Sequence, residues 1–336
     1  MKLLLLGGTR FLGRHVVEAA LARGHVVTTF TRGKLPVPWG DRVDARVGER
    51  DPRIAPGLEA LGKGEWDCVV DLSGYVPRIV GASAELLAGR TGRYMFISSV
   101  SVYGEQDRAG IDERGMRLTL DDLATEDVLA NYGALKAASE DVVTNGFGTR
   151  ATLVRPGLIV GPHDGTDRFG YWVARFVHPR LLGDRAERAV APAPASRGIQ
   201  LIDARDLATF IVGLAESDSG GAFNAASAPG QWTMGELVAA LVAASPAPPK
   251  PAWIDDAVLL EHKVEPWVGL PLWIPQSDPE HAGFFAFDTQ RAQDAGLASR
   301  PLAETIADTA AWLAERDNAG AWKLTLSAAH ERAILG

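Results

Sequence analysis

Short apolar runs and helical patterns alternate along the first half of the chain. Each apolar run predicts a buried strand, and the runs are "KLLLL", "HVVTTF", "DCVVDL", "RYMFISSV" and "RATLVRPGLIV". Between the first two, "RFLGRHVVEAALARG" repeats apolar residues at helical spacing, and Gly24 ends the predicted helix. This alternation predicts an α/β fold in which a doubly wound parallel sheet carries helices on both faces.

The pattern changes after residue 162. "APAPASRG" and "SPAPPKPAW" are proline-rich loops, and between them "DARDLATFIVGLAES" and "TMGELVAALVAAS" predict helices. We expect residues 1–162 to form the sheet domain and residues 163–336 to form a smaller mixed lobe, with some segments returning to the sheet. Trp253, Trp267 and Trp273 share one stretch, where they either pack this lobe or line a substrate cleft.

Composition narrows the class of protein and its partners. The chain has 336 residues, of which 46% are hydrophobic and 23% charged, as in an ordinary globular protein. Its net charge of -8 disfavours nucleic-acid and anionic-membrane partners. The apolar run from Leu3 to Leu6 is shorter than a secretion-signal core, and a single cysteine, Cys68, excludes a disulfide within the chain. We therefore expect a cytoplasmic protein without a membrane or nucleic-acid partner.

A glycine-containing loop, "GGTRFLG", joins the first predicted strand to the first predicted helix. Glycines let the backbone approach a pyrophosphate, and a helix N-terminus offers free N–H groups and a partial positive charge. Arg10 stands where such loops usually have their middle glycine. The sequence predicts a dinucleotide-binding domain over residues 1–162 whose loop contacts come from Gly7, Thr9, Arg10, Phe11, Leu12 and Gly13.

The end of the second predicted strand bears on the choice of cofactor. NAD-binding proteins place an acidic residue there to accept hydrogen bonds from the adenosine ribose. Here the position holds Thr31, followed by Arg32 and Lys34. A guanidinium pairs with a 2'-phosphate, which an acid would repel, so we predict NADP(H). The alternative is that Arg32 and Lys34 are only solvated loop residues. Arg10 either contacts the same phosphate or faces protein acids or solvent.

A second group of residues indicates catalysis. In "ANYGALKAASE", Tyr132 and Lys136 are four positions apart, which places both on one face of a helix. Upstream, "MFISSVSVYG" presents hydroxyls at the end of a strand, where open parallel sheets have their active sites. A surface tyrosine with a solvated lysine is the alternative.

With these segments in this order, the chain resembles the short-chain dehydrogenase/reductase superfamily, in its extended NAD(P)-dependent epimerase/dehydratase branch. The segments are "GGTRFLGRH", "FTRGK", "DLSGY", "SSVSVYG", "YGALK", "RPGLIVGP" and "IDARDLA". The loop is similar to that of a subgroup containing bacterial reductase-like proteins and chloroplast stem-loop-binding proteins, in which an arginine at the middle-glycine position is usual. The resemblance implies a Rossmann fold with a C-terminal substrate-binding lobe.

The resemblance also implies roles for individual residues. Ser99 would hydrogen-bond a substrate oxygen, and Tyr132 would be the acid in reduction or the base in oxidation. Lys136 would bind the nicotinamide ribose and, with the nicotinamide, favour the phenolate form of Tyr132. The remaining cofactor contacts that it implies are Leu72, Ser73, Gly74 and Pro156, and Glu49 either faces adenine or is an exposed turn residue.

Departures from the family pattern narrow the expected reaction. Related dehydratases carry an acidic pair after the active-site hydroxyl, but here Val100 and Ser101 follow, which argues against dehydration. Thr31 and Arg32 favour exchangeable NADPH, so we predict an NADPH-dependent reductase of a carbonyl or C=N bond in a small metabolite. A nucleotide-sugar epimerase with bound NAD(P) and a non-catalytic RNA-binding relative are the alternatives. The resemblance leaves a homodimer open.

Three positions in the second half have both a functional and a structural interpretation. Arg168, in "GPHDGTDRFGYW", either pairs with a substrate phosphate or carboxylate or makes a structural salt bridge. His163 and Asp164 have no second cluster at ligand spacing, so we expect no metal. The charged residues of "IDARDLA" are Asp203, Arg205 and Asp206, and in many relatives this segment lies near the substrate. The structural alternative is that Asp203 caps the following helix.

Overall fold

One end of the molecule is built around a seven-stranded sheet in which every neighbouring pair is parallel. In this computed structural model, which describes residues 1–183, 186–217, 219–316 and 322–336, the strand order is β11-β6-β5-β4-β1-β2-β3. The strands are β1 (Lys2–Leu6), β2 (Val26–Thr31), β3 (Val43–Val47), β4 (Trp66–Asp71), β5 (Thr91–Ile97), β6 (Ala151–Pro156) and β11 (Gly221–Ala225). The predicted doubly wound parallel sheet is confirmed.

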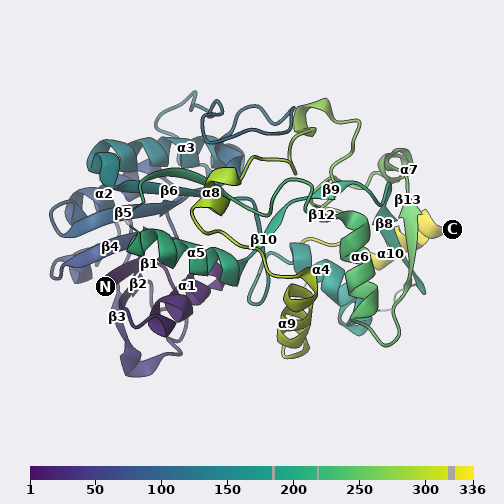
Figure 1. The fold of residues 1–336 in the computed structure, drawn as a ribbon, viewed down its shortest axis with the longest axis horizontal. Coiled ribbons are helices and arrows are strands. Elements are labelled where there is room, and N and C mark those ends of the chain that lie inside the picture. Colours follow the sequence, from purple (N-terminus) through teal and green to yellow (C-terminus); the bar gives the residue numbers. More distant parts are fainter. Residues whose placement is uncertain (184–185, 218, 317–321) are drawn as a thin grey trace.

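Helices cover both faces of the sheet (Figure 1). On one face lie α1 (Phe11–Ala22) and α5 (Ala204–Glu216), and on the other α2 (Pro77–Leu87) and α3 (Val128–Phe147). The run of four leucines in β1 serves both faces: Leu3 and Leu5 pack toward α1, and Leu4 and Leu6 toward α2. Because successive strand residues point to opposite faces, a strand covered on both sides reads as a continuous apolar run.

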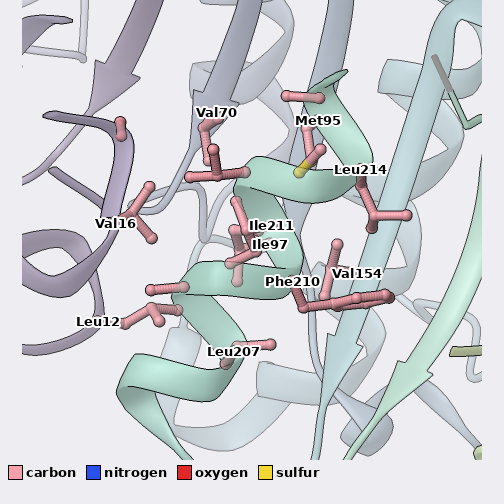
Figure 2. Close-up of a cluster of buried hydrophobic side chains, with 14 of the residues drawn as sticks. Leu12, Val16, Val70, Met95, Ile97, Val154, Leu207, Phe210, Ile211 and Leu214 are labelled. Carbon is pink, nitrogen blue, oxygen red and sulfur yellow. The ribbon is translucent and has the colours of Figure 1, made fainter. Parts of the chain in front are cut away.

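The second half of the chain contributes to this same core. Figure 2 shows α5 lying along α1 and the sheet, with its apolar side chains directed at β4, β5 and β6. The side chains labelled there are Leu12, Val16, Val70, Met95, Ile97, Val154, Leu207, Phe210, Ile211 and Leu214. The edge strand β11 also comes from this half and pairs with β6. Residues beyond 162 therefore complete both the sheet and one of its helical layers.

A second apolar core lies at the other end of the molecule, where the C-terminus is found (Figure 1). It is built mainly from α4 (Arg168–Phe176), β8 (Arg188–Pro192), α6 (Met234–Ala243), α7 (Asp256–Glu261), α9 (Leu302–Ala314) and α10 (Ala328–Leu335). The predicted helix α6 begins at a capping box: Thr233 accepts the Glu236 N–H at 3.2 Å, and the Glu236 carboxylate accepts the Thr233 N–H at 2.8 Å.

Short elements connect these parts. β13 (Lys250–Ile254) pairs with β8, β10 (Leu201–Asp203) with β7 (Leu158–Val160), and β12 (Trp232–Thr233) with β9 (Gly198–Ile199). The remaining helices are α8 (Gln290–Asp294) and 3-10 turns at Gly40–Arg42, Glu59–Leu61, Val100–Val102, Gly148–Arg150, Pro179–Leu182 and Pro279–His281. Across the described ranges, no helix combines the length and the apolar character needed to cross a membrane.

One predicted strand is wrong in its extent. "RATLVRPGLIV" divides into β6, which ends at Pro156, and β7, which pairs with β10 in a separate small sheet. Proline lacks the N–H that would continue the ladder, and Gly157 follows it directly. The break directs the chain from the large sheet toward the second core.

Candidate active site

The glycine loop places the start of α1 directly against the turn after β1. Gly7 and Gly8 both have a φ of 118°, in which an L side chain is strained. A β-carbon on Gly13 would lie 2.8 Å from the N and Cα atoms of Gly8. The first turn of α1 has no side-chain cap at Arg10, so its N–H groups stay available at the carboxyl end of β1. This cradle fits a pyrophosphate, as expected from the sequence.

Two of the predicted phosphate-binding cations are exposed near this loop. Within the described ranges, neither Arg10 nor Arg32 has an ion-pair or hydrogen-bond partner for its guanidinium. The Thr31 hydroxyl accepts the Gly33 N–H at 3.2 Å, so it closes the turn that carries Arg32. Lys34 is also exposed. The alternative in which Arg10 pairs with a protein acid is not observed.

The segment Leu72–Gly74 lies beside the glycine loop. A β-carbon on Gly7 would lie 3.3 Å from the Leu72 Cβ atom, and the Ser73 hydroxyl donates to the Leu6 carbonyl at 2.9 Å. Gly74 has no room for a side chain, because a β-carbon there would lie 2.6 Å from the Phe96 ring. The structure thus brings these three predicted cofactor residues to the end of β1.

A buried ion pair beneath this segment was not foreseen. Asp71, the last residue of β4, is fully buried and accepts hydrogen bonds from Arg50 Nη2 and from the Tyr94 hydroxyl, each at 2.8 Å. It also accepts the Ser73 N–H at 3.1 Å. Glu49 is half-buried and accepts the Arg50 N–H at 2.8 Å. Arg50 follows the unpredicted strand β3, so no sequence signal connected it with Asp71.

Ser99, Tyr132 and Lys136 come together at the carboxyl end of β5. Ser99 lies close enough to Tyr132 to lower the pKa of its hydroxyl, and the Ser99 hydroxyl donates to the Ser101 hydroxyl at 3.0 Å. Lys136 is buried and donates to the carbonyl oxygens of Gly74 at 2.7 Å and Ile97 at 2.8 Å. Two of its three N–H groups are thereby fixed, and the third remains for a ligand.

Electrostatics around Tyr132 and Lys136 are dominated by burial. Burial raises the pKa of Tyr132, while the Ser99 hydrogen bond and the charge of Arg168 oppose the shift. Burial also lowers the pKa of Lys136 to about 8, although the Asp71 charge opposes it. The ammonium of Lys136 is directed to two backbone carbonyls, and burial favours the protonated form of Tyr132. That Lys136 and the nicotinamide together favour the phenolate stays a prediction.

A close approach of α3 to the strand end makes this arrangement possible. A β-carbon on Gly133 would overlap the Ser101 carbonyl oxygen and would lie 2.8 Å from Leu118 Cδ1. Asn131, two residues earlier, has non-helical angles (φ -125°, ψ 27°) that bend the start of the helix. Tyr132 lies between them and so reaches Ser99. The sequence analysis missed Gly133, although it lies inside the "NYGALK" stretch.

On the second-lobe side, Arg168 begins α4. Its guanidinium lies 5.2 Å from the ring centroid of Trp267. No carboxylate in the described ranges forms an ion pair with it, although the charge of Asp164 opposes the lowering of its pKa by burial. The alternative of a structural salt bridge is therefore not observed. The other two tryptophans differ: Trp273 is fully buried and donates to Asp256 at 2.8 Å, whereas Trp253 is exposed. Only Trp267 stands beside the site.

The remaining candidates have structural partners. Asp203 accepts the Arg205 N–H at 2.8 Å and caps α5, and Asp206 accepts from the Arg300 guanidinium at 2.7 Å. Pro156 ends β6, buried beside the sheet. The His163 ring lies near the His15 ring, tilted by 42°, with ring centroids 5.7 Å apart. In the part of the chain that the structure describes, no group of three or more His, Cys, Asp or Glu residues could hold a metal ion.

The glycine cradle, the sheet order and the Ser99, Tyr132 and Lys136 set define an NAD(P)-dependent enzyme of the short-chain dehydrogenase/reductase type. The model of the NAD dependent epimerase/dehydratase family matches residues 3–226, and the chain belongs to that family. The resemblance drawn from the sequence is confirmed.

Solved structures share the fold over nearly the whole chain. A putative epimerase from Burkholderia cenocepacia has 18% identity and a TM-score of 0.67, over 93% of this chain and 98% of that one. The UDP-glucuronic acid 4-epimerase of Bacillus cereus, solved with NAD, has 15% identity and a TM-score of 0.66, over 96% and 100%. A human epimerase family protein, solved with NADPH, has 19% identity and a TM-score of 0.58, over 93% and 99%.

A relative among characterised proteins is more similar in sequence but covers less of the chain. The chloroplast stem-loop binding protein of 41 kDa b from Arabidopsis thaliana is 27% identical over 176 residues, which are 48% of this chain and 43% of that protein. The match thus spans less than half the length of that relative. Together the comparisons support a nicotinamide cofactor of either kind, NAD or NADPH.

Proposed function

We propose that the protein is an NADPH-dependent reductase of a carbonyl or C=N bond in a small metabolite. The observation that carries this proposal is the pair of exposed arginines, Arg10 and Arg32, beside the glycine cradle, with Thr31 in place of an acid. Unpaired guanidiniums at this place suit a 2'-phosphate. Free exchange of NADPH suits a net reduction more than a reaction that recycles its cofactor.

The roles of the chain's own residues follow from their surroundings. Tyr132 is neutral because burial raises its pKa, so it can donate a proton to the substrate oxygen or nitrogen. Ser99, which lies close enough to Tyr132 to lower its pKa, orients that atom. Lys136 uses its third N–H for the ribose, since the other two hold Gly74 and Ile97. When bound, the reduced nicotinamide supplies a hydride to the carbon.

The residues after Ser99 support reduction over elimination. Val100 is buried, and Ser101 donates its N–H to the Ser99 oxygen at 3.0 Å. Elimination of water would need an acid and a base there, and neither residue supplies them. We further propose a small-molecule substrate and a cytoplasmic location, which suits a chain whose single cysteine, Cys68, is buried.

The test is NADPH oxidation with a panel of aldehydes, ketones and imines, using wild type and Tyr132→Phe. We expect steady loss of NADPH absorbance in step with product, and at least a hundredfold lower kcat in Tyr132→Phe with unchanged NADPH affinity. Full turnover by Tyr132→Phe would refute its role. Isomerisation without net NADPH loss would instead show an epimerase, and salt-sensitive RNA binding without turnover would show a non-catalytic protein.

A further inference from the structure

The guanidinium of Arg168 stands near the reaction centre without a carboxylate. Its Nε atom is buried and, among the residues that the structure describes, has no hydrogen-bond partner. The two nearest acids in the sequence are engaged elsewhere. Asp164 accepts from the Thr166 N–H and hydroxyl at 2.8 and 2.9 Å, and Asp167 accepts from Arg316 at 2.6 Å and the Lys323 N–H at 2.8 Å.

Trp267 fixes the orientation of this guanidinium. The indole covers one face of Arg168 at 5.2 Å, a cation–π contact that leaves the N–H groups at the edge of the guanidinium for other partners. Trp267 is itself held in place: its backbone N–H donates to the Trp273 carbonyl at 2.9 Å, and its ring meets the Phe284 ring edge-on with centroids 5.0 Å apart. The stack is therefore preorganised on the second core.

The charge of Arg168 also reaches Tyr132. Its field lowers the pKa of the Tyr132 hydroxyl against the effect of burial, and burial lowers the pKa of Arg168 itself. The charge of Asp164 partly offsets this desolvation, but no carboxylate in the described ranges is paired with the guanidinium, so an anionic ligand would relieve more of the cost. Because the charges of Arg168 and Tyr132 act on each other, a small ligand touching Arg168 also lies toward Tyr132.

We propose that Arg168 binds a carboxylate or phosphate group of the substrate while the reactive carbonyl faces Tyr132. This inference rests on the proposed reductase function and names its substrate class: small carbonyl compounds that carry an anionic oxygen group. A planar carboxylate pairs with the guanidinium edge through two parallel N–H···O bonds, and a phosphate presents two oxygens in the same way.

The test compares substrates that differ only in the anion. NADPH oxidation is measured with 4-carboxybenzaldehyde against its methyl ester, and with glyceraldehyde 3-phosphate against glyceraldehyde. We expect wild type to prefer the anionic member of one pair by about 10- to 100-fold in kcat/KM. A preference in the benzaldehyde pair would indicate a carboxylate substrate, and a preference in the glyceraldehyde pair would indicate a phosphate substrate. Arg168→Met abolishes the preference, and Arg180→Met, an exposed arginine of the same lobe, keeps it.

A binding measurement separates this inference from the proposed function. Benzoate and inorganic phosphate are titrated by calorimetry into wild type, Arg168→Met and Trp267→Leu. We expect one anion to bind wild type at least tenfold more tightly than either variant. If no aldehyde is reduced but this dependence on Arg168 holds, the reductase proposal fails and the anion site stands. If neutral and anionic aldehydes are reduced equally and neither anion needs Arg168, the anion site is refuted and the reductase stands.

Discussion

Gly133 in α3 lies against the carbonyl oxygen of Ser101, with no space between them for a β-carbon. This contact brings Tyr132 close enough to Ser99 for Ser99 to lower its pKa. The position of the proposed proton donor therefore depends on a residue with no side chain, one position away from it.

Gly133→Ala is expected to push α3 away from the strand end. Because Tyr132 moves with the helix, kcat should fall at least tenfold, with a loss of stability of about 1–3 kcal/mol from overpacking. Gly146→Ala is the matched control, since Gly146 lies in the same helix with nothing within 4 Å of a β-carbon there. The control should gain about 0.5–1 kcal/mol and keep its activity. Equal behaviour of the two variants in urea unfolding and turnover assays would contradict the steric argument.

The buried pair of Arg50 and Asp71 gives a stability prediction. Arg50→Met leaves the Asp71 carboxylate buried without its counter-charge, which should cost about 3–5 kcal/mol in the free energy of unfolding. The double variant Arg50→Met/Asp71→Asn removes both charges and should be clearly more stable than Arg50→Met alone. Urea denaturation of the two proteins measures the difference, and a double variant no better than the single one would show that the charge pair is unimportant.

The lowered pKa of Lys136 gives a pH prediction. Below pH 8 the ammonium is charged and can bind the ribose, and as the pH rises through about 8 it loses its proton. The value of kcat/KM should therefore fall across this range, whereas Tyr132, whose pKa is raised, stays protonated. Lys136→Arg keeps a charge at every pH and should lose this alkaline decline, at a lower overall rate. The same decline in that variant would assign it to another group.

The exposed arginines predict cofactor preference. Arg10→Ala and Arg32→Ala should each weaken NADPH binding about tenfold, or about 1.4 kcal/mol, and leave NADH binding unchanged. Fluorescence titration at fixed salt measures both affinities. Added salt should reduce the difference between the NADPH and NADH affinities of wild type, because the contact of the arginines with the 2'-phosphate is electrostatic and exposed. An equal loss for NADPH and NADH would place these side chains away from the 2'-phosphate.

Much of the fold could be predicted from the sequence because its strands are buried on both faces. The leucine run of β1 and the apolar runs of β4 and β5 are periodic signals that need no tertiary information. The edge strands β3 and β11 were missed, since "VDARV" and "GAFNA" mix apolar residues with charged, polar or small ones. Edge strands are partly exposed, so their composition resembles that of loops.

Some features of the candidate site could likewise be predicted from the sequence, and others could not. The glycine loop and the Tyr132–Lys136 spacing are local patterns, and the structure brings them to one end of the sheet. The pair of Arg50 and Asp71 joins residues far apart in the chain, and the stack of Arg168 on Trp267 joins two more distant ones. Such contacts depend on tertiary packing, which hydrophobic periodicity does not encode.

The place of β11 at the edge of the large sheet has a consequence for folding during synthesis. Residues 1–162 leave the ribosome with the apolar side chains of Val70, Met95 and Val154 still uncovered, because α5 has not yet been made. The chain then emerges through α4 and β8 before α5 and β11 arrive. The large sheet can thus begin to form early, but it cannot be completed until residue 225 has left the ribosome and β11 pairs with β6.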